Sequence, residues 1–131
     1  MSAPSRPSIL VVDDEEDVVV FLTTLLEDHG YATSSARDGA EAIARVRAHR
    51  PDLITLDVTM PNQSGVRTYR ELKTDPALAS IPVIIVTGIS QDFQQFISSR
   101  RQVPPPEGYQ SKPIDPERFL ALVGQLLSHG Q

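Results

Sequence analysis

Cysteine is absent from this sequence of 131 residues, which excludes disulfide bonds and thiolate metal sites. The absence is compatible with a reducing cytoplasm, where we expect the protein to reside. Long apolar stretches are missing too, since runs such as VVVFLTTLL at 18–26 are far shorter than a membrane span. The first residues, MSAPSRPS, lack the apolar core of a signal peptide, and we predict a short disordered arm over residues 1–7.

An excess of positive charge is also missing. The chain has 12 lysine and arginine residues against 17 aspartate and glutamate residues, a net charge of −5. This balance argues against a surface that binds nucleic acid directly. The content of 40% apolar and 22% charged residues is typical of a soluble globular protein, and the length fits one domain with one core.

Two patterns of apolar residues alternate along the chain. Short continuous apolar runs predict strands at 9–14, 31–36, 52–57 and 81–88, with a fifth strand leading to Lys112. Helical spacing and capping residues predict helices at 15–29, 38–50, 64–73, 91–101 and 115–127. Asp38 is the predicted N-cap of the second helix, and the last helix is expected to be capped near Asp115. The run at 31–36 is only weakly hydrophobic, which indicates an edge strand.

Strict alternation of strands and helices with short connections predicts a parallel sheet with helices on both faces. The apolar runs of the first, third and fourth strands show no polar alternation, as expected where both faces of a sheet are buried. The fold class is therefore a doubly wound α/β sandwich, with one domain over 8–128 and a short tail over 129–131.

Polar residues stand where several of these strands end. The first strand ends in Asp13 and Asp14, the third in Asp57 and the fourth in Thr87, while the fifth leads to Lys112. In an open parallel sheet, ligands bind at the carboxyl ends of the strands. We therefore expect three carboxylates, one hydroxyl and one ammonium group to meet at the same edge.

Other residues near this edge have simpler interpretations. Glu15, Glu16 and Asp17 are expected only to stabilise the start of the first helix through its dipole. Gly65 is assigned to the turn at the start of the third helix.

Three carboxylates in one place repel one another unless a cation lies among them, and Mg²⁺ prefers such oxygen ligands. A carboxylate beside the metal can act as a nucleophile toward phosphorus and form an aspartyl phosphate. Lys112, the Thr87 hydroxyl and backbone N–H groups near Val58 and Gly88 are then candidates to bind the phosphoryl oxygens. Asp57 is the predicted phosphoacceptor.

The fragments VVDDEE, DLITLDVTMPNQSG, LKTDPALASIPVIIVTG and YQSKPID together resemble the receiver domain of two-component response regulators, along nearly the whole chain. The resemblance implies a flavodoxin-like sheet of five strands in the order 2-1-3-4-5. It also implies that Asp57 takes a phosphoryl group from a phosphohistidine on a sensor histidine kinase or a histidine phosphotransfer protein. Such a module promotes its own phosphorylation and dephosphorylation but acts in signalling rather than as an enzyme.

The same resemblance implies the ligands of the metal. Asp14 and Asp57 would bind Mg²⁺ directly, Asp13 through water, and the backbone carbonyl of Thr59 would complete the protein ligands. Thr87 would be the hydroxyl that switches on phosphorylation, Tyr109 the aromatic residue that follows it, and Lys112 the cation that binds the phosphoryl group.

Three alternatives remain open at this stage. A haloacid-dehalogenase-like phosphatase also uses an aspartyl nucleophile after a strand, but it usually has a second acid two residues later, where this chain has Thr59. A flavodoxin-like cofactor binder would need a phosphate loop after the first strand, and DDEED carries the wrong charge for one. A receiver-like scaffold that only binds proteins would not need Mg²⁺.

The segment QVPPPEG departs from the family pattern, because it lengthens the connection between Thr87 and Lys112. Its prolines predict that the preceding helix ends by about Gln102, and that residues 103–107 form a polyproline-like excursion on the surface. We expect this excursion to alter the partner face, so that the protein is a monomer or a non-standard dimer that binds an unknown output protein. Because no effector domain follows Gln131, the chain is expected to be a stand-alone receiver or a piece of a longer protein.

Overall fold

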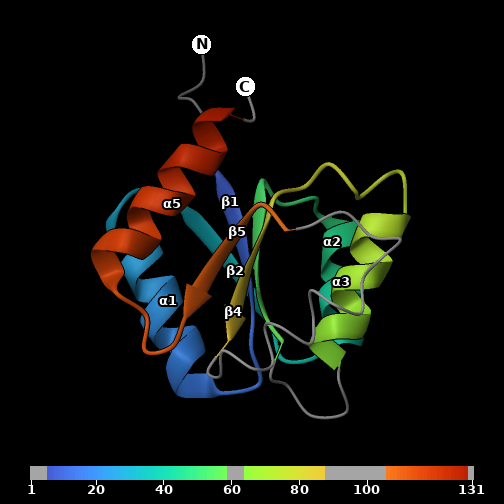
Figure 1. Cartoon of the computed structure of the whole chain (residues 1–131), viewed down its shortest axis with the longest axis horizontal. Helices are drawn as coiled ribbons and strands as arrows, with labels where there is room; N and C mark the ends of the chain where they lie inside the picture. Colours follow the sequence, from blue (N-terminus) through green and yellow to red (C-terminus); the bar gives the residue numbers. More distant parts are fainter. Residues whose placement is uncertain (1–5, 59–63, 88–105, 130–131) are drawn as a thin grey trace.

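The computed structural model of the chain describes residues 6–58, 64–87 and 106–129 (Figure 1). The strands in these ranges are β1 (Ser8–Val12), β2 (Ala32–Ala36), β3 (Leu53–Asp57), β4 (Val83–Thr87) and β5 (Gly108–Ser111). The helices are α1 (Glu16–Asp28), α2 (Gly39–Ala48), α3 (Ser64–Thr74) and α5 (Pro116–His129). None of them is both long and apolar enough to cross a membrane.

The five strands form one parallel sheet in the order β2-β1-β3-β4-β5, as predicted. β2 is an edge strand, in agreement with its weak hydrophobicity. All five side chains of β3 are buried, which explains the continuous apolar run that precedes Asp57.

The helices cover the two faces of the sheet in pairs, with α1 and α5 on one face and α2 and α3 on the other (Figure 1). Successive residues of β1 alternate between the two cores, because side chains of a strand point to opposite faces. The core beneath α1 and α5 includes Ile9, Val11, Leu22, Leu26, Leu53, Ile84, Phe119 and Val123. The core beneath α2 and α3 includes Leu10, Val12, Val46, Ile54, Leu56, Tyr69, Leu72 and Ile85.

Capping residues recognised in the sequence fix the starts of two helices. The Asp38 carboxylate accepts a hydrogen bond from the Glu41 N–H at 2.8 Å, before α2. The Asp115 carboxylate accepts one from the Glu117 N–H at 3.0 Å, before α5. Both predicted caps are confirmed.

The predicted helix at 91–101, its end near Gln102 and most of the proline segment lie outside the described residues. Of residues 103–107 only the last two are described: Pro106 is buried and Glu107 is exposed, so the predicted surface excursion does not hold for Pro106 and stays a prediction for 103–105. Glu107 donates its N–H to the Val83 carbonyl at 3.1 Å and so already pairs with the start of β4.

Candidate functional site

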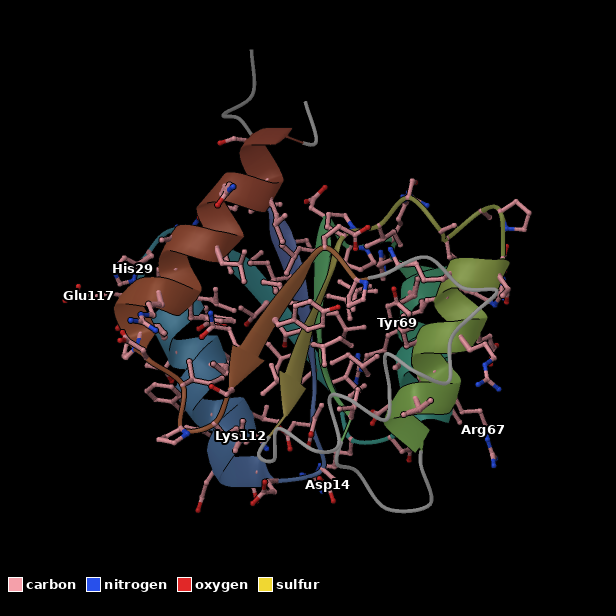
Figure 2. The ribbon with its side chains drawn as sticks, in the orientation of Figure 1. Asp14, His29, Arg67, Tyr69, Lys112 and Glu117 are labelled. Carbon is pink, nitrogen blue, oxygen red and sulfur yellow. The ribbon has the colours of Figure 1, made fainter. Side chains whose placement is uncertain are left out.

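Three carboxylates meet at the carboxyl edge of the sheet. The parallel register that pairs Val12 of β1 with Leu56 of β3 brings the next residues, Asp13 and Asp57, side by side. One ligand oxygen from each of Asp13, Asp14 and Asp57 lies within 4.8 Å of the others. Asp13 and Asp57 are buried, whereas Asp14 is exposed and lies at the edge of the domain, near Lys112 (Figure 2). The predicted convergence of the three acids is present in the structure.

The ionised form of the Asp13 carboxyl is destabilised by its place in this cluster. Burial, together with the negative charge of Asp57, raises the pKa of the Asp13 carboxyl from 3.8 to about 6. A hydrogen bond from the Glu15 N–H at 2.9 Å and the Lys112 ammonium act in the opposite direction. A divalent cation among these oxygens would remove this destabilisation, because opposite charge stabilises the ionised carboxylates.

Lys112 projects toward the same cluster from the end of β5 (Figure 2). Its Nζ lies 3.2 Å from Asp13 Oδ2 and 3.5 Å from Asp57 Oδ2. Burial lowers the pKa of Lys112, but a hydrogen bond to Glu15 and the charges of Asp57 and Asp13 outweigh burial and leave the pKa raised. The lysine is therefore held as an ammonium ion beside the carboxylate that the sequence nominates as the acceptor.

Glu15 belongs to this cluster, although its position in the sequence predicts only an interaction with the helix dipole. Glu15 is the N-cap of α1, but its side chain caps no backbone N–H of the helix. Its Oε1 lies 3.0 Å from Lys112 Nζ instead, the shortest of the three carboxylate contacts of that ammonium group. The expectation for Glu15 is wrong, whereas Glu16 and Asp17 do lie in the first turn of α1.

Other predicted site residues are placed only in part. Thr87 is the last residue of β4 and pairs with Ser111, while its side chain and all of Thr59 and Gly88 lie outside the described part of the chain. Val58 donates its N–H to the Val86 carbonyl at 3.1 Å. That N–H is used in the sheet, whereas the neighbouring N–H groups of Thr59 and Gly88 lie outside the described residues, so the binding of phosphoryl oxygens by N–H groups near Val58 and Gly88 stays a prediction.

Tyr109 lies on β5, next to Ile85 of β4. Its side chain is half-buried and packs against the core beneath α2 and α3. The packing is compatible with the predicted role of Tyr109 as a residue that moves, because part of the ring remains exposed.

The structure requires glycine at position 65 for a steric reason, in addition to the turn predicted from the sequence. A Cβ atom at this position would lie 2.2 Å from the backbone oxygen of Asp57 and 2.6 Å from Cα of Val58. Only glycine lets the first turn of α3 approach the end of β3 so closely. The glycine therefore helps to fix the backbone of Asp57.

Comparison with known proteins identifies the class to which this fold and site belong. The profile of the response regulator receiver domain matches residues 9–124. The chain belongs to this family and is a receiver domain, a signalling module of two-component systems.

Individual relatives span nearly all of the chain. It is 33% identical to Protein PilH of Pseudomonas aeruginosa, over 92% of this chain and 97% of that protein. It is 37% identical to the polar-differentiation response regulator DivK of Brucella anthropi, over 92% of this chain and 95% of the relative. These matches do not favour the phosphatase, cofactor-binding or scaffold alternatives.

Solved structures agree with this assignment. The signal receiver domain of a signal transduction histidine kinase from Syntrophus aciditrophicus superimposes with a TM-score of 0.83 at 34% sequence identity, over 94% of this chain and 91% of that one. The fold predicted from the sequence, including the strand order, is confirmed.

Proposed function

We propose that Asp57 is the phosphoacceptor of this receiver domain. The observation that carries the proposal is the buried Asp57 carboxylate at the end of β3, with Asp13 and Asp14 on one side and the Lys112 ammonium 3.5 Å away. Of the three acids in the cluster, Asp57 alone is the last residue of a strand. That strand, β3, is the central strand of the sheet.

The residues present fit a Mg²⁺ ion. Asp13, Asp14 and Asp57 offer hard oxygen ligands at one point, and the repulsion among them favours a divalent cation. In the proposal Asp14 and Asp57 bind the ion directly, Asp13 binds it through water, and the Thr59 carbonyl adds a ligand. When bound, the ion supplies positive charge that offsets the negative charge of the transferring phosphoryl group.

In the transfer step an Asp57 carboxylate oxygen forms a bond to phosphorus as the phosphorus–nitrogen bond of a phosphohistidine breaks. The bonding electron pair leaves with the imidazole nitrogen. Lys112 binds an oxygen of the transferred group, since its ammonium already lies beside Asp57. The Thr87 hydroxyl and Tyr109 then respond to the new charge and shift the domain toward its active conformation.

The donor in this scheme is a sensor histidine kinase or a histidine phosphotransfer protein in the cytoplasm, and the output is a further protein. We propose a monomer or a non-standard dimer, since Pro104–Pro106 lie next to the start of β5 in the sequence. Sedimentation of the beryllofluoride-activated protein, with and without these three prolines, tests this part. A tight dimer that survives the deletion unchanged would contradict a role of the prolines in partner choice.

Incubation with phosphoramidate and Mg²⁺, followed by intact mass measurement, tests the acceptor. One added phosphoryl group is expected on the wild-type protein and none on Asp57→Asn. Phosphorylation should disappear with a chelator and with Asp14→Ala, and weaken with Asp13→Ala. Equal modification of Asp57→Asn would show that the acceptor is another residue, and a protein that neither binds Mg²⁺ nor accepts a phosphoryl group would be the scaffold.

A further inference from the structure

The closest carboxylate to the Lys112 ammonium is that of Glu15, and Glu15 is no member of the predicted metal site. The Nζ–Oε1 distance is 3.0 Å, and the two residues are 97 positions apart in the sequence. The Glu15 side chain is 63% exposed, whereas that of Lys112 is only 18% exposed. Glu15 therefore covers Lys112 from the solvent side and can leave it without disturbing the core.

Lys112 has three N–H donors, and three carboxylates of the described residues lie around it. Asp13, Glu15 and Asp57 lie 3.2, 3.0 and 3.5 Å from Nζ. An incoming phosphoryl oxygen therefore has to compete with a carboxylate for the ammonium group. Glu15 is the carboxylate that gives way, because it is exposed and the other two are buried.

We propose that Glu15 is the resting-state counter-ion of Lys112 and that it slows phosphorylation of this chain by small anionic donors. The proposal rests on the proposed role of Asp57 and Lys112, and it adds a positioning residue that acts through the lysine. In the resting protein Glu15 occupies the ammonium group beside Asp57, so that an arriving phosphate group has to displace the Glu15 carboxylate.

The negative charge of Glu15 also acts on the product. A phosphoryl group adds about −1.5 to −2 charge. Placed on Asp57 and bound by Lys112, it would stand within a few ångströms of the Glu15 carboxylate, and like charges at such distances repel. Removal of the charge at position 15 therefore also favours the phosphorylated state once it has formed, an effect on the product that is separate from the rate of phosphorylation.

Glu16 provides a matched control for the test. It is the next residue, has the same side chain and is exposed, and no hydrogen bond or ion pair of its side chain is found within the described ranges. Glu15→Gln and Glu16→Gln thus remove the same charge at nearly the same place, and only the first removes the contact with Lys112.

The rate constant of phosphorylation by acetyl phosphate is measured for both variants at saturating Mg²⁺. We expect Glu15→Gln to react about threefold to tenfold faster than wild type, and Glu16→Gln to stay within about twofold. In a Lys112→Gln background, Glu15→Gln should change the remaining rate by less than about twofold, because its effect passes through the lysine.

A second readout needs no phosphorylation. NMR signals of the Lys112 side-chain ammonium in the metal-free protein should move in Glu15→Gln and not in Glu16→Gln. If the two single variants react at the same rate, or if Glu15→Gln leaves the Lys112 signals in place, the inference is overturned. The proposed function stands in that case as long as wild type is phosphorylated and Asp57→Asn is not, so the two failures are distinguishable.

Discussion

The ammonium group of Lys73 on α3 lies 3.0 Å from each carboxylate oxygen of Glu107, the residue that precedes β5. The Lys73 side chain is 1% exposed. Its Nζ also donates to the carbonyls of Ala79 and Ile81, at 3.2 and 3.0 Å. Glu107 in turn accepts the N–H of Val83 at 2.8 Å. The pair therefore joins α3, the start of β4 and the start of β5, the strand that leads to Lys112.

Glu107→Gln should lower the free energy of unfolding by about 2–4 kcal/mol, because it leaves a buried ammonium group without its counter-charge. Urea unfolding of the purified protein measures this difference. Lys73→Met combined with Glu107→Gln should be less destabilising than Glu107→Gln alone, since no unpaired buried charge remains.

The surface pair Arg47–Asp75 is the control, with a distance of 2.8 Å and an arginine side chain that is 53% exposed. Asp75→Asn should lower the free energy of unfolding far less than Glu107→Gln does, as is usual for exposed ion pairs. Equal losses for Glu107→Gln and Asp75→Asn would show that the burial of Lys73 has no energetic consequence.

Gly65→Ala should lower the free energy of unfolding by roughly 1–3 kcal/mol, because the new methyl group meets the backbone of Asp57 and Val58. It should also slow phosphorylation of Asp57, since either α3 or the end of β3 has to shift. Thermal unfolding and intact mass after phosphoramidate treatment measure the two effects.

Gly124 in α5 is the matched control for Gly65. A Cβ at Gly124 meets nothing closer than the Tyr31 hydroxyl at 4.0 Å. Gly124→Ala should therefore raise the free energy of unfolding by about 0.5–1 kcal/mol, the usual gain from replacing glycine inside a helix. A loss of stability for Gly124→Ala that matches the loss for Gly65→Ala would contradict the steric explanation.

The fold could be predicted from the sequence because its local signals agree with its tertiary structure. The run at 53–57 is apolar up to Asp57, and both faces of β3 are buried. Asp38 and Asp115 mark the starts of α2 and α5. The alternation of elements predicts a parallel sheet, but the order of its strands came from the resemblance to a family.

The ion pairs of Lys73 and Lys112 could not be predicted from the sequence in the same way. Lysine is normally exposed, so its residue type argues against burial, although helical spacing from Val66 and Tyr69 places Lys73 on the apolar face of α3. Its partner Glu107 is 34 residues away, beyond any local pattern. The sequence shows that Glu15 is close to Asp13 in the chain. Only the three-dimensional structure shows that the Lys112 ammonium lies beside the Glu15 carboxylate.

Beryllofluoride with Mg²⁺ should change the NMR chemical shifts of the Tyr109 ring, since a negative group on Asp57 is expected to shift the population of conformations. Tyr31 serves as the internal control, because it packs on the other face of the sheet. Thr87→Ala should reduce the response of Tyr109 severalfold. A full response in Thr87→Ala, or equal changes at Tyr31 and Tyr109, would contradict a coupling between Thr87 and Tyr109.

The raised pKa of Asp13 predicts how the stability of the metal-free protein depends on pH. Folding moves this pKa from 3.8 to about 6, so between these values the folded protein keeps a proton that the unfolded chain releases. The contribution of Asp13 to stability is therefore fully present below pH 4 and is lost as the pH rises through 6. In a chelator, Asp13→Asn should raise the free energy of unfolding by roughly 1–3 kcal/mol at pH 7.5, and by much less at pH 4.5. Urea unfolding at the two pH values measures the difference, and saturating Mg²⁺ should shrink the gain at pH 7.5 because the ion stabilises the ionised cluster. An Asp13→Asn protein that gains equally at both pH values would show that the substitution acts through packing and not through the charge of Asp13.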